Sequence, residues 1–163
     1  MPYFLLAAVL VVLDQIVMLL IRHNIALGES VTLIPGVMDL TYVQNTGAAF
    51  SLFRQHTWIL AVISLVVAVL IVIALLKRVF TRPFGVISLA VVLAGAVGNL
   101  IDRAFFGYVT DMFQTIFMNF AVFNVADICV VVGGFAAVLY YLFFYEKLEG
   151  RPKDSGAPQE EQA

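Results

Sequence analysis

Four stretches of apolar residues, each long enough to cross a bilayer, dominate this chain. They cover roughly residues 3–21, 58–76, 84–101 and 121–145. A membrane-spanning helix needs about 20 largely apolar residues. Backbone exposed to lipid must satisfy its own hydrogen bonds, so each stretch is predicted to be a helix. The expected fold class is mainly α: an integral membrane bundle of four transmembrane helices, forming a single domain over residues 1–148.

The composition excludes several other classes of protein. The chain is 63% hydrophobic and only 12% charged, whereas soluble domains are about 25% charged. A net charge of −2 offers no basic surface for nucleic acid. The single cysteine, Cys129, lies in an apolar stretch and is expected to be a buried, inert thiol. His23 and His56 lack the spacing of metal ligands, so no metal site is predicted.

Lysine and arginine residues predict the orientation in the membrane. They gather in the loop between the second and third stretches and after the fourth, at Lys77, Arg78, Arg82, Lys147, Arg151 and Lys153. Loops rich in these residues stay on the cytoplasmic side. Both termini are therefore expected in the cytoplasm, with residues 149–163 as a disordered tail. The first stretch lacks a basic start and contains Asp14, so it is interpreted as a retained helix rather than a cleaved signal peptide.

The two longer connections are then extracytoplasmic, and they differ in character. Residues 23–57 contain two segments rich in β-branched residues on either side of Pro35-Gly36. This pattern predicts a small β-sheet platform on the outer membrane surface. Residues 102–120 are rich in phenylalanine and tyrosine. Aromatic side chains favour the membrane interface, so this segment is predicted to be a short loop lying against the headgroups.

Carboxylates in apolar surroundings are the chief functional signal. Asp127 lies in the fourth stretch, where an ionisable group costs roughly 2.5–3.5 kcal/mol. Asp14, Asp102 and Asp111 lie inside or just beyond other stretches. The predicted topology brings all four towards the outer interface. Asn124 and Asp127 are three residues apart, as are Asn99 and Asp102, so each pair is expected to share a helix face.

Several of these residues also have a purely structural interpretation. Asp14 is as consistent with a hydrogen bond between helices as with a function. Asp102 and Arg103 favour a structural ion pair over direct chemistry. Asn45 could be a turn residue, and an aspartate such as Asp111 is common in loops. Gly47, Gly95 and Gly98 would permit close approach between helices, or between the backbone and a ligand.

Asp127 needs a partner, and a second carboxylate nearby would make the two share a proton. Such a pair can activate water with one member and protonate a carbonyl oxygen with the other. No Ser–His or Cys–His pairing competes in the sequence. A Ser–Lys pair is disfavoured because every lysine falls on the predicted cytoplasmic side.

Five ordered motifs carry a resemblance to a known family: Asp14-Gln15, Asn45-Thr-Gly-Ala-Ala-Phe-Ser51, Gly98-Asn-Leu-Ile-Asp-Arg103, Val109-Thr-Asp111 and Phe123-Asn-Val-Ala-Asp127. With these motifs the chain resembles the signal peptidase II family of bacterial membrane aspartyl proteases, over nearly its whole length. The resemblance implies an endopeptidase that removes the signal peptide from diacylglyceryl-modified prolipoproteins, cutting just before the lipidated cysteine. It also implies the bacterial cytoplasmic (inner) membrane as location, with membrane lipids as partners, and sensitivity to the cyclic peptide globomycin.

The resemblance further assigns roles to residues of this chain. It implies that Asp111 and Asp127 are the catalytic pair and that no metal or organic cofactor is needed. The supporting and substrate-binding residues would be Asp14, Asn45, Gly47, Asn99, Asp102, Arg103 and Asn124. Residues 102–120 would form a mobile lid that carries Asp111 to Asp127, with the active site on the extracytoplasmic face. A monomer is expected.

Two departures from the family pattern and two rival functions remain. Met18 stands where the family usually has a lysine, so Asp14 lacks a cation one helical turn away, and Met112-Phe113 changes the sequence after Asp111.

A proton- or cation-coupled transporter using Asp14 and Asp127 is one rival. It would need polar groups through the full membrane depth, which stretches such as Val67–Leu76 lack. A non-enzymatic assembly protein for lipidated partners is the other.

Overall fold

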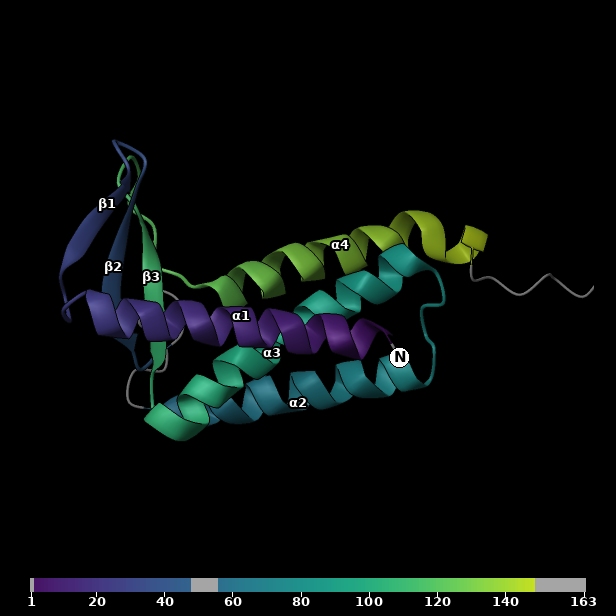
Figure 1. Cartoon of the computed structure of the whole chain (residues 1–163). Helices are drawn as coiled ribbons and strands as arrows, with labels where there is room; N and C mark the ends of the chain where they lie inside the picture. The colour runs from purple at the N-terminus through teal and green to yellow at the C-terminus, as the bar shows by residue number, and fades with distance from the viewer. Residues whose placement is uncertain (1, 48–55, 149–163) are drawn as a thin grey trace, which may run out of the picture.

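The computed structural model describes residues 2–47 and 56–148. Four helices lie side by side, and a small sheet stands at one end of them (Figure 1). The helices are α1 (Pro2–Asn24), α2 (Thr57–Leu76), α3 (Pro83–Phe106) and α4 (Val125–Leu148). All four are long and apolar enough to cross a membrane, which confirms the predicted helical bundle. The predicted tail 149–163 and residues 48–51 of the second motif lie outside the described residues.

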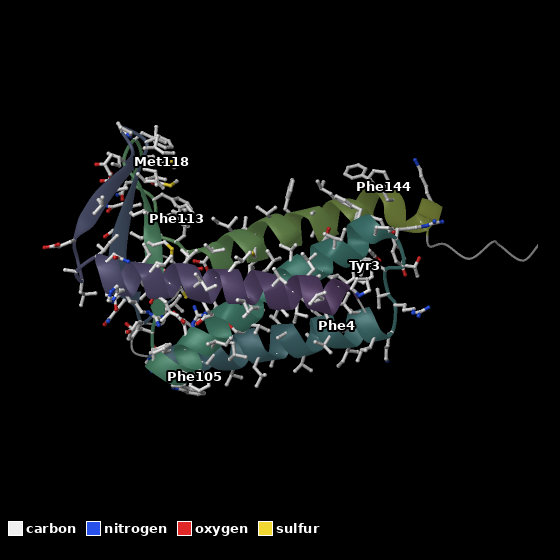
Figure 2. The ribbon with its side chains drawn as sticks, viewed as in Figure 1. Tyr3, Phe4, Phe105, Phe113, Met118 and Phe144 are labelled. Atoms are coloured by element: carbon white, nitrogen blue, oxygen red, sulfur yellow. The ribbon has the colours of Figure 1, made fainter. Side chains whose placement is uncertain are left out.

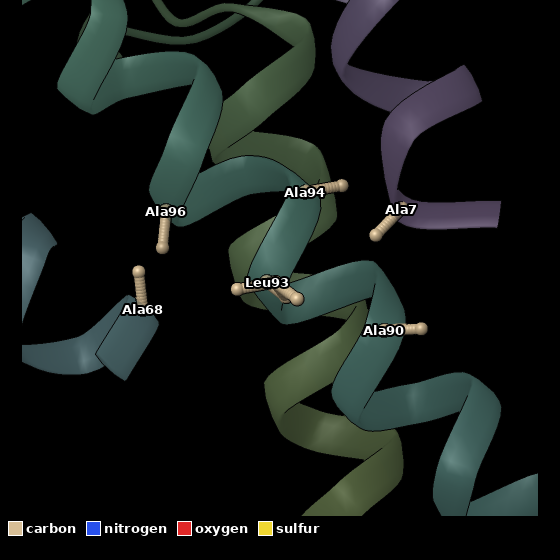
Figure 3. Packing of buried hydrophobic residues seen from close by; sticks show 6 residues of the cluster. All are labelled: Ala7, Ala68, Ala90, Leu93, Ala94 and Ala96. Carbon is tan, nitrogen blue, oxygen red and sulfur yellow. The ribbon is translucent and has the colours of Figure 1, made fainter. Parts of the chain in front are cut away.

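The helix α3 forms the centre of the bundle and packs against the other three helices. Figure 3 shows Ala90 and Ala94 of α3 pointing towards Ala7 of α1, while Ala96 faces Ala68 of α2. These small side chains let the helices approach closely, as is typical of packing inside membranes. Large apolar side chains of the other helices, such as Leu19 and Val131, point outwards. This arrangement suits a bundle solvated by lipid.

Glycines bring α3 against its neighbours near the sheet end. A Cβ atom on Gly95 would lie 2.3 Å from the carbonyl oxygen of Ala126 in α4. A Cβ atom on Gly98 would lie 2.5 Å from Oδ2 of Asp14 in α1. Both positions therefore require the absence of a side chain, and the predicted close approach at Gly95 and Gly98 is confirmed. The site described below depends on this contact between α1, α3 and α4.

The sheet has three antiparallel strands in the order β1 (Ser30–Ile34), β2 (Met38–Asn45) and β3 (Val109–Thr115). The predicted platform between the first two helices is confirmed, with Gly36 in its turn at φ +73°. The third strand is a correction. It occupies the middle of residues 102–120, where a loop was expected. Its backbone finds hydrogen-bond partners on β2, and Val109 and Met112 are buried against Met18 and Tyr42, which favours a strand over a loop.

Helix boundaries also differ from the prediction at the sheet end. The helix α3 continues to Phe106, and Gly107 ends it in the left-handed conformation at φ +74°. The helix α4 begins at Val125 rather than near residue 121. Aromatic side chains occupy both ends of the bundle, with Phe105 and Phe113 at the sheet end and Tyr3 and Phe144 at the other (Figure 2). Rings at these two levels match the aromatic belts of membrane proteins.

Candidate active site

A cavity of about 410 Å³ opens at the sheet end of the bundle, between α3, α4 and the sheet. Seven of the nine predicted site residues line it: Asn45, Gly47, Asn99, Arg103, Asp111, Asn124 and Asp127. The remaining wall is almost entirely apolar and comes mainly from α4 and the segment before it. Asp14 and Asp102 are buried beside this cavity and do not line it. The structure thus gathers polar residues from four separate motifs at one place.

Asp111 projects from β3 and is only 2% exposed. Its two carboxylate oxygens accept hydrogen bonds from Nδ2 of Asn45 (2.8 Å) and Nδ2 of Asn124 (2.7 Å). The amide of Asn45 is itself oriented, because its Oδ1 accepts a hydrogen bond from the backbone N–H of Gly47 at 2.9 Å. Asn45 is therefore more than a turn residue, since it places a donor on Asp111. Asp111 thus lies in this network on strand β3.

Asp127 lies in the first turn of α4, where Asn124 caps the helix. The backbone N–H of Asp127 donates to Oδ1 of Asn124 (2.8 Å), and the backbone N–H of Asn124 donates to Oδ2 of Asp127 (3.3 Å). This reciprocal pattern is a capping box. Asn124 thus precedes the helix instead of lying within it, which corrects the predicted helix start but keeps the two side chains together. The positive end of the helix dipole favours a carboxylate at position 127.

Two asparagines connect the two carboxylates. Nδ2 of Asn99 donates to Oδ1 of Asp127 at 2.8 Å. Nδ2 of Asn124, which binds Asp111, also lies 3.3 Å from Oδ1 of Asn99. Each carboxylate is therefore held by an amide donor, and the two amides contact each other. The arrangement fixes both acids on one cavity and limits the freedom of either side chain.

The electrostatic surroundings make Asp111 a weak acid. Burial raises its pKa from the ordinary value of 3.8 to about 7. The hydrogen bond from Asn45 opposes the shift, the negative charge of Asp127 adds to it, and Asn124 and Arg103 oppose it further. A carboxyl group with a pKa near neutrality can exchange a proton under physiological conditions. The contribution of Asp127 shows that its carboxylate lies close enough to Asp111 to act on it.

Arg103 and Asp102 have different partners from those predicted. NH1 of Arg103 lies 3.4 Å from Oγ of Ser64 in α2 and 3.4 Å from the backbone oxygen of Asn99. Asp102 forms its ion pair with Arg22 of α1, at 2.6 Å. Successive residues on a helix point in different directions, so Arg103 faces the cavity while Asp102 faces α1. The predicted Asp102–Arg103 ion pair is therefore wrong, although Asp102 does have a structural ion pair.

Asp14 supports α4 from a neighbouring helix. Its side chain is buried, and Oδ1 accepts a hydrogen bond from the backbone N–H of Ala126 at 3.0 Å. The first turn of a helix has N–H groups without partners within the helix, and Asp14 satisfies one of them. Nε2 of Gln15 lies 3.3 Å from its other oxygen. Of the two interpretations of Asp14, these contacts favour the structural one, a hydrogen bond between helices.

Met18 and Met112 both belong to an apolar cluster beneath the sheet. Each is fully buried, and the cluster also contains Tyr42 and Val109. The lysine that the family usually has at this position could act as a cation for Asp14. Met18 has no charge and instead packs against the sheet. The two residues that depart from the family pattern therefore belong to one apolar cluster between α1 and β3.

Sequence reasoning missed two residues near the site. Arg22 belongs to none of the five motifs, and Thr110 is part of one without an assigned role, yet they bond to each other and to Asp102. One signal was available for Arg22. It lies eight residues after Asp14, so it shares the face of α1 that carries Asp14 and Met18. In the described parts of the chain, no group of three or more histidine, cysteine, aspartate or glutamate residues is placed to hold a metal.

Comparisons with known proteins show what the whole chain is similar to. The chain is 47% identical to a lipoprotein signal peptidase of Enterococcus faecalis over 145 residues, which cover 89% of each chain. It is 42% identical to a lipoprotein signal peptidase of Brevibacillus brevis, over 82% of this chain and 89% of the relative. A solved structure described as a bacterial membrane enzyme has a TM-score of 0.82 and 26% identity, covering 94% of this chain and 93% of the other.

The family described as "Signal peptidase (SPase) II" matches residues 6–144. This range covers α2, α3, the sheet and nearly all of α1 and α4, together with every residue that lines the cavity. Together with the identity to the two peptidases, the match establishes both the family and its general activity on lipoprotein signal peptides. The chain therefore belongs to the signal peptidase II family and is a membrane enzyme.

Proposed function

We propose that Asp111 and Asp127 form a catalytic pair that removes the signal peptide from diacylglyceryl-modified prolipoproteins, cutting just before the lipidated cysteine. One observation carries the proposal. Two carboxylates from different elements, a strand and a helix N-terminus, face one cavity and are joined through Asn99 and Asn124. Pairs of acids in such a setting hold one proton between them, because two nearby charges of the same sign repel.

The raised pKa of Asp111 supports a mechanism based on water. In the resting pair, one carboxyl is protonated and the other is ionised. The ionised member takes a proton from a water molecule, whose oxygen attacks the carbonyl carbon of the scissile peptide. The protonated member donates its proton to the carbonyl oxygen. As the intermediate collapses and the C–N bond breaks, the carboxyl that took the proton from water gives it to the amine of the cysteine. The other carboxylate takes a hydroxyl proton from the intermediate, which restores the starting pair.

The walls of the cavity suit an apolar substrate that lies in the membrane. Ile128, Val131 and Val132 of α4 continue the cavity along the helix, and Val131 is 68% exposed. A signal helix packed along this face would place its end, and the acyl chains beside it, next to the two acids. Membrane lipid covers the same surface when no substrate is present. Nothing in this arrangement requires a second copy of the chain, so we propose a monomer.

The distribution of charge supports an extracytoplasmic active site. Lys77, Arg78, Arg82 and Lys147 lie in the α2–α3 loop and near the end of α4, at the end of the bundle opposite the sheet (Figure 1). Positive residues stay on the cytoplasmic side of a membrane. The sheet and the cavity would then face outwards, with both termini in the cytoplasm. In a bacterium the proposed site would then lie at the outer surface of the cytoplasmic membrane.

The transporter alternative lacks a polar path. In the halves of α2, α3 and α4 remote from the sheet, the only buried residue with a polar side chain among the described residues, apart from the aromatic Tyr140, is Ser88. Its hydroxyl donates to the backbone oxygen of Phe84, within its own helix. A proton or cation would therefore meet no continuous chain of polar groups. The alternative of a non-enzymatic assembly protein predicts no peptide turnover.

The direct test is cleavage of a purified diacylated prolipoprotein by the protein in detergent, with mass spectrometry of the new N-terminus. The product should begin at the modified cysteine, the unlipidated precursor should remain uncut, and globomycin should block the reaction. Asp111→Asn and Asp127→Asn should each abolish turnover while the protein stays folded. Asp39→Asn, on β2 and outside the cavity, is the matched control and should cleave normally. Normal cleavage by either active-site variant would contradict the proposal.

A further inference from the structure

Arg22 joins three elements of the fold at one point. Its NH2 group donates to Oδ2 of Asp102 in α3 at 2.6 Å, and its Nε donates to Oγ1 of Thr110 in β3 at 2.7 Å. The backbone N–H of Thr110 donates to the same Oδ2 of Asp102 at 3.0 Å. Arg22, Asp102 and Thr110 therefore form a closed triangle of hydrogen bonds, here called the Arg22 triad. It connects α1, α3 and β3.

The surroundings make these bonds strong. Asp102 and Thr110 are completely buried, and the side chain of Arg22 is 14% exposed. The guanidinium carbon of Arg22 lies 4.1 Å from the centre of the Phe106 ring, which shields it on one side. Hydrogen bonds to charged groups are shorter and stronger than neutral ones, and more so away from water. Without Arg22, the buried charge of Asp102 would lose its cation.

The Arg22 triad lies directly beside the candidate catalytic strand residue. Thr110 precedes Asp111, and both its side chain and its backbone N–H are bound within the triad. The pairing of β2 with β3 shifts register between Leu40 and Val43, and Val43 is the partner of Asp111. The ladder is thus regular from Val109 to Asp111 and irregular just beyond Asp111, so pairing with β2 constrains the strand on one side of this residue only. Arg22 itself does not line the cavity.

We propose that Arg22 is a positioning residue, which through Asp102 and Thr110 sets where β3 presents Asp111 to Asp127. The inference rests on the proposed function of Asp111 and Asp127. It extends that function by assigning a role to an arginine that bonds Thr110, the residue next to Asp111 on β3. Small errors in the placement of a catalytic group reduce rate strongly, by up to about 100-fold for about 1 Å. Because Arg22 does not touch the cavity, substrate binding should change little.

The test is steady-state kinetics with a diacylated prolipoprotein, measuring kcat and KM separately and normalising to folded protein. Arg22→Met should lower kcat at least about 10-fold and change KM less than about 3-fold. Arg22→Lys keeps a positive charge beside Asp102, but an ammonium group cannot bond Asp102 and Thr110 in one rigid arrangement. The reduction of kcat in this variant should therefore be intermediate. Lys77→Met, at the opposite end of the bundle, is the control cation and should retain the wild-type kcat.

A second pair of variants tests the path through the strand. Thr110→Val removes the hydroxyl contact with Arg22 but keeps the backbone N–H, so it should resemble Arg22→Lys. The double variant Arg22→Lys/Thr110→Val should be no slower than either single one, because both remove the same contact. If Arg22→Met does not fold, the kcat values of these variants test the role of Arg22 in its place.

Three results would overturn the inference: a wild-type kcat in Arg22→Met, or in both Arg22→Lys and Thr110→Val; a loss confined to KM; or a lower melting temperature with unchanged kcat per folded enzyme. Asp111→Asn serves as the reference for the underlying function. An active Asp111→Asn would contradict the catalytic pair itself. An inactive Asp111→Asn beside a fully active Arg22→Met would contradict only the role of Arg22.

Discussion

Replacing Asp111 by asparagine should flatten the pH dependence of thermal stability. In the folded protein, burial raises the pKa of Asp111 from 3.8 to about 7. The folded state therefore binds this proton more tightly than the unfolded chain does. The resulting stabilisation is complete below about pH 4 and is lost as the pH rises to about 7. Asparagine has no such proton, so the variant should lack this part of the slope.

The size of the effect follows from the shift. A change of one pKa unit corresponds to about 1.36 kcal/mol, so a shift of roughly three units gives an upper limit of about 4 kcal/mol. For a chain of 163 residues this corresponds to a difference in melting temperature on the order of 10 °C across the window. Asparagine also replaces one acceptor oxygen, which bonds Asn45 or Asn124, by a donor. That change is independent of pH, so the slope rather than the absolute temperature is the informative quantity.

The assay is thermal unfolding in a non-titrating detergent, followed by intrinsic fluorescence at half-unit steps from pH 4 to 8. All other titrating groups are common to both proteins, so the difference between the two curves isolates the carboxyl pair. Gln114→Ala, an exposed and uncharged position on the same strand, should retain the wild-type slope. Parallel curves for the wild-type protein and Asp111→Asn would refute the reasoning, since they would mean that Asp111 releases its proton equally in both states.

Two further substitutions test the packing and capping around the site. Gly98→Ala should lower stability by about 1–3 kcal/mol in a thermal melt, because the new Cβ would lie 2.5 Å from Oδ2 of Asp14. Gly134→Ala is its control, since a Cβ there meets no atom within 4 Å, and a loss equal to that of Gly98→Ala would contradict the steric argument. Asn124→Ala should cost about 1–2 kcal/mol through the lost cap and should also reduce cleavage. The exposed Asn119→Ala should change neither quantity, and an Asn124→Ala protein with wild-type stability would contradict the assigned cap.

Much of the fold follows from local sequence signals. Apolar stretches of the right length indicate the four helices, and β-branched segments around Pro35-Gly36 indicate the first two strands. The third strand was missed because its partners lie about 66 residues away, as the Asn45–Asp111 contact shows. The aromatic residues on both sides of residues 109–115 fit an interfacial loop equally well until the strand that pairs with this segment is known. The start of α4 was misplaced because residues 121–123 are as apolar as the helix that follows Asn124.

The candidate site was predictable as a set of residues but not as a set of contacts. Seven of the nine predicted residues line one cavity, because the family motifs mark them without any knowledge of their partners. The ion pair of Asp102 was assigned to its neighbour Arg103, since sequence shows only adjacency. Its actual partner, Arg22, is 80 residues away and is brought to it by the packing of α1 on α3. Contacts between elements depend on packing, which hydropathy and spacing do not reveal.

The central claim is that Asp111 and Asp127 act as one unit on one water molecule. The most direct measurement is the single-turnover rate of Asp111→Asn, Asp127→Asn and the double variant on a diacylated prolipoprotein. Residues that act together lose nearly all of their effect when either is removed. The double variant should therefore be no slower than the slower of the two single variants, and both singles should be at least about 1,000-fold slower than the wild-type protein. Cleavage by either single variant near the wild-type rate, or a double variant slower by the product of the two single effects, would contradict the catalytic pair.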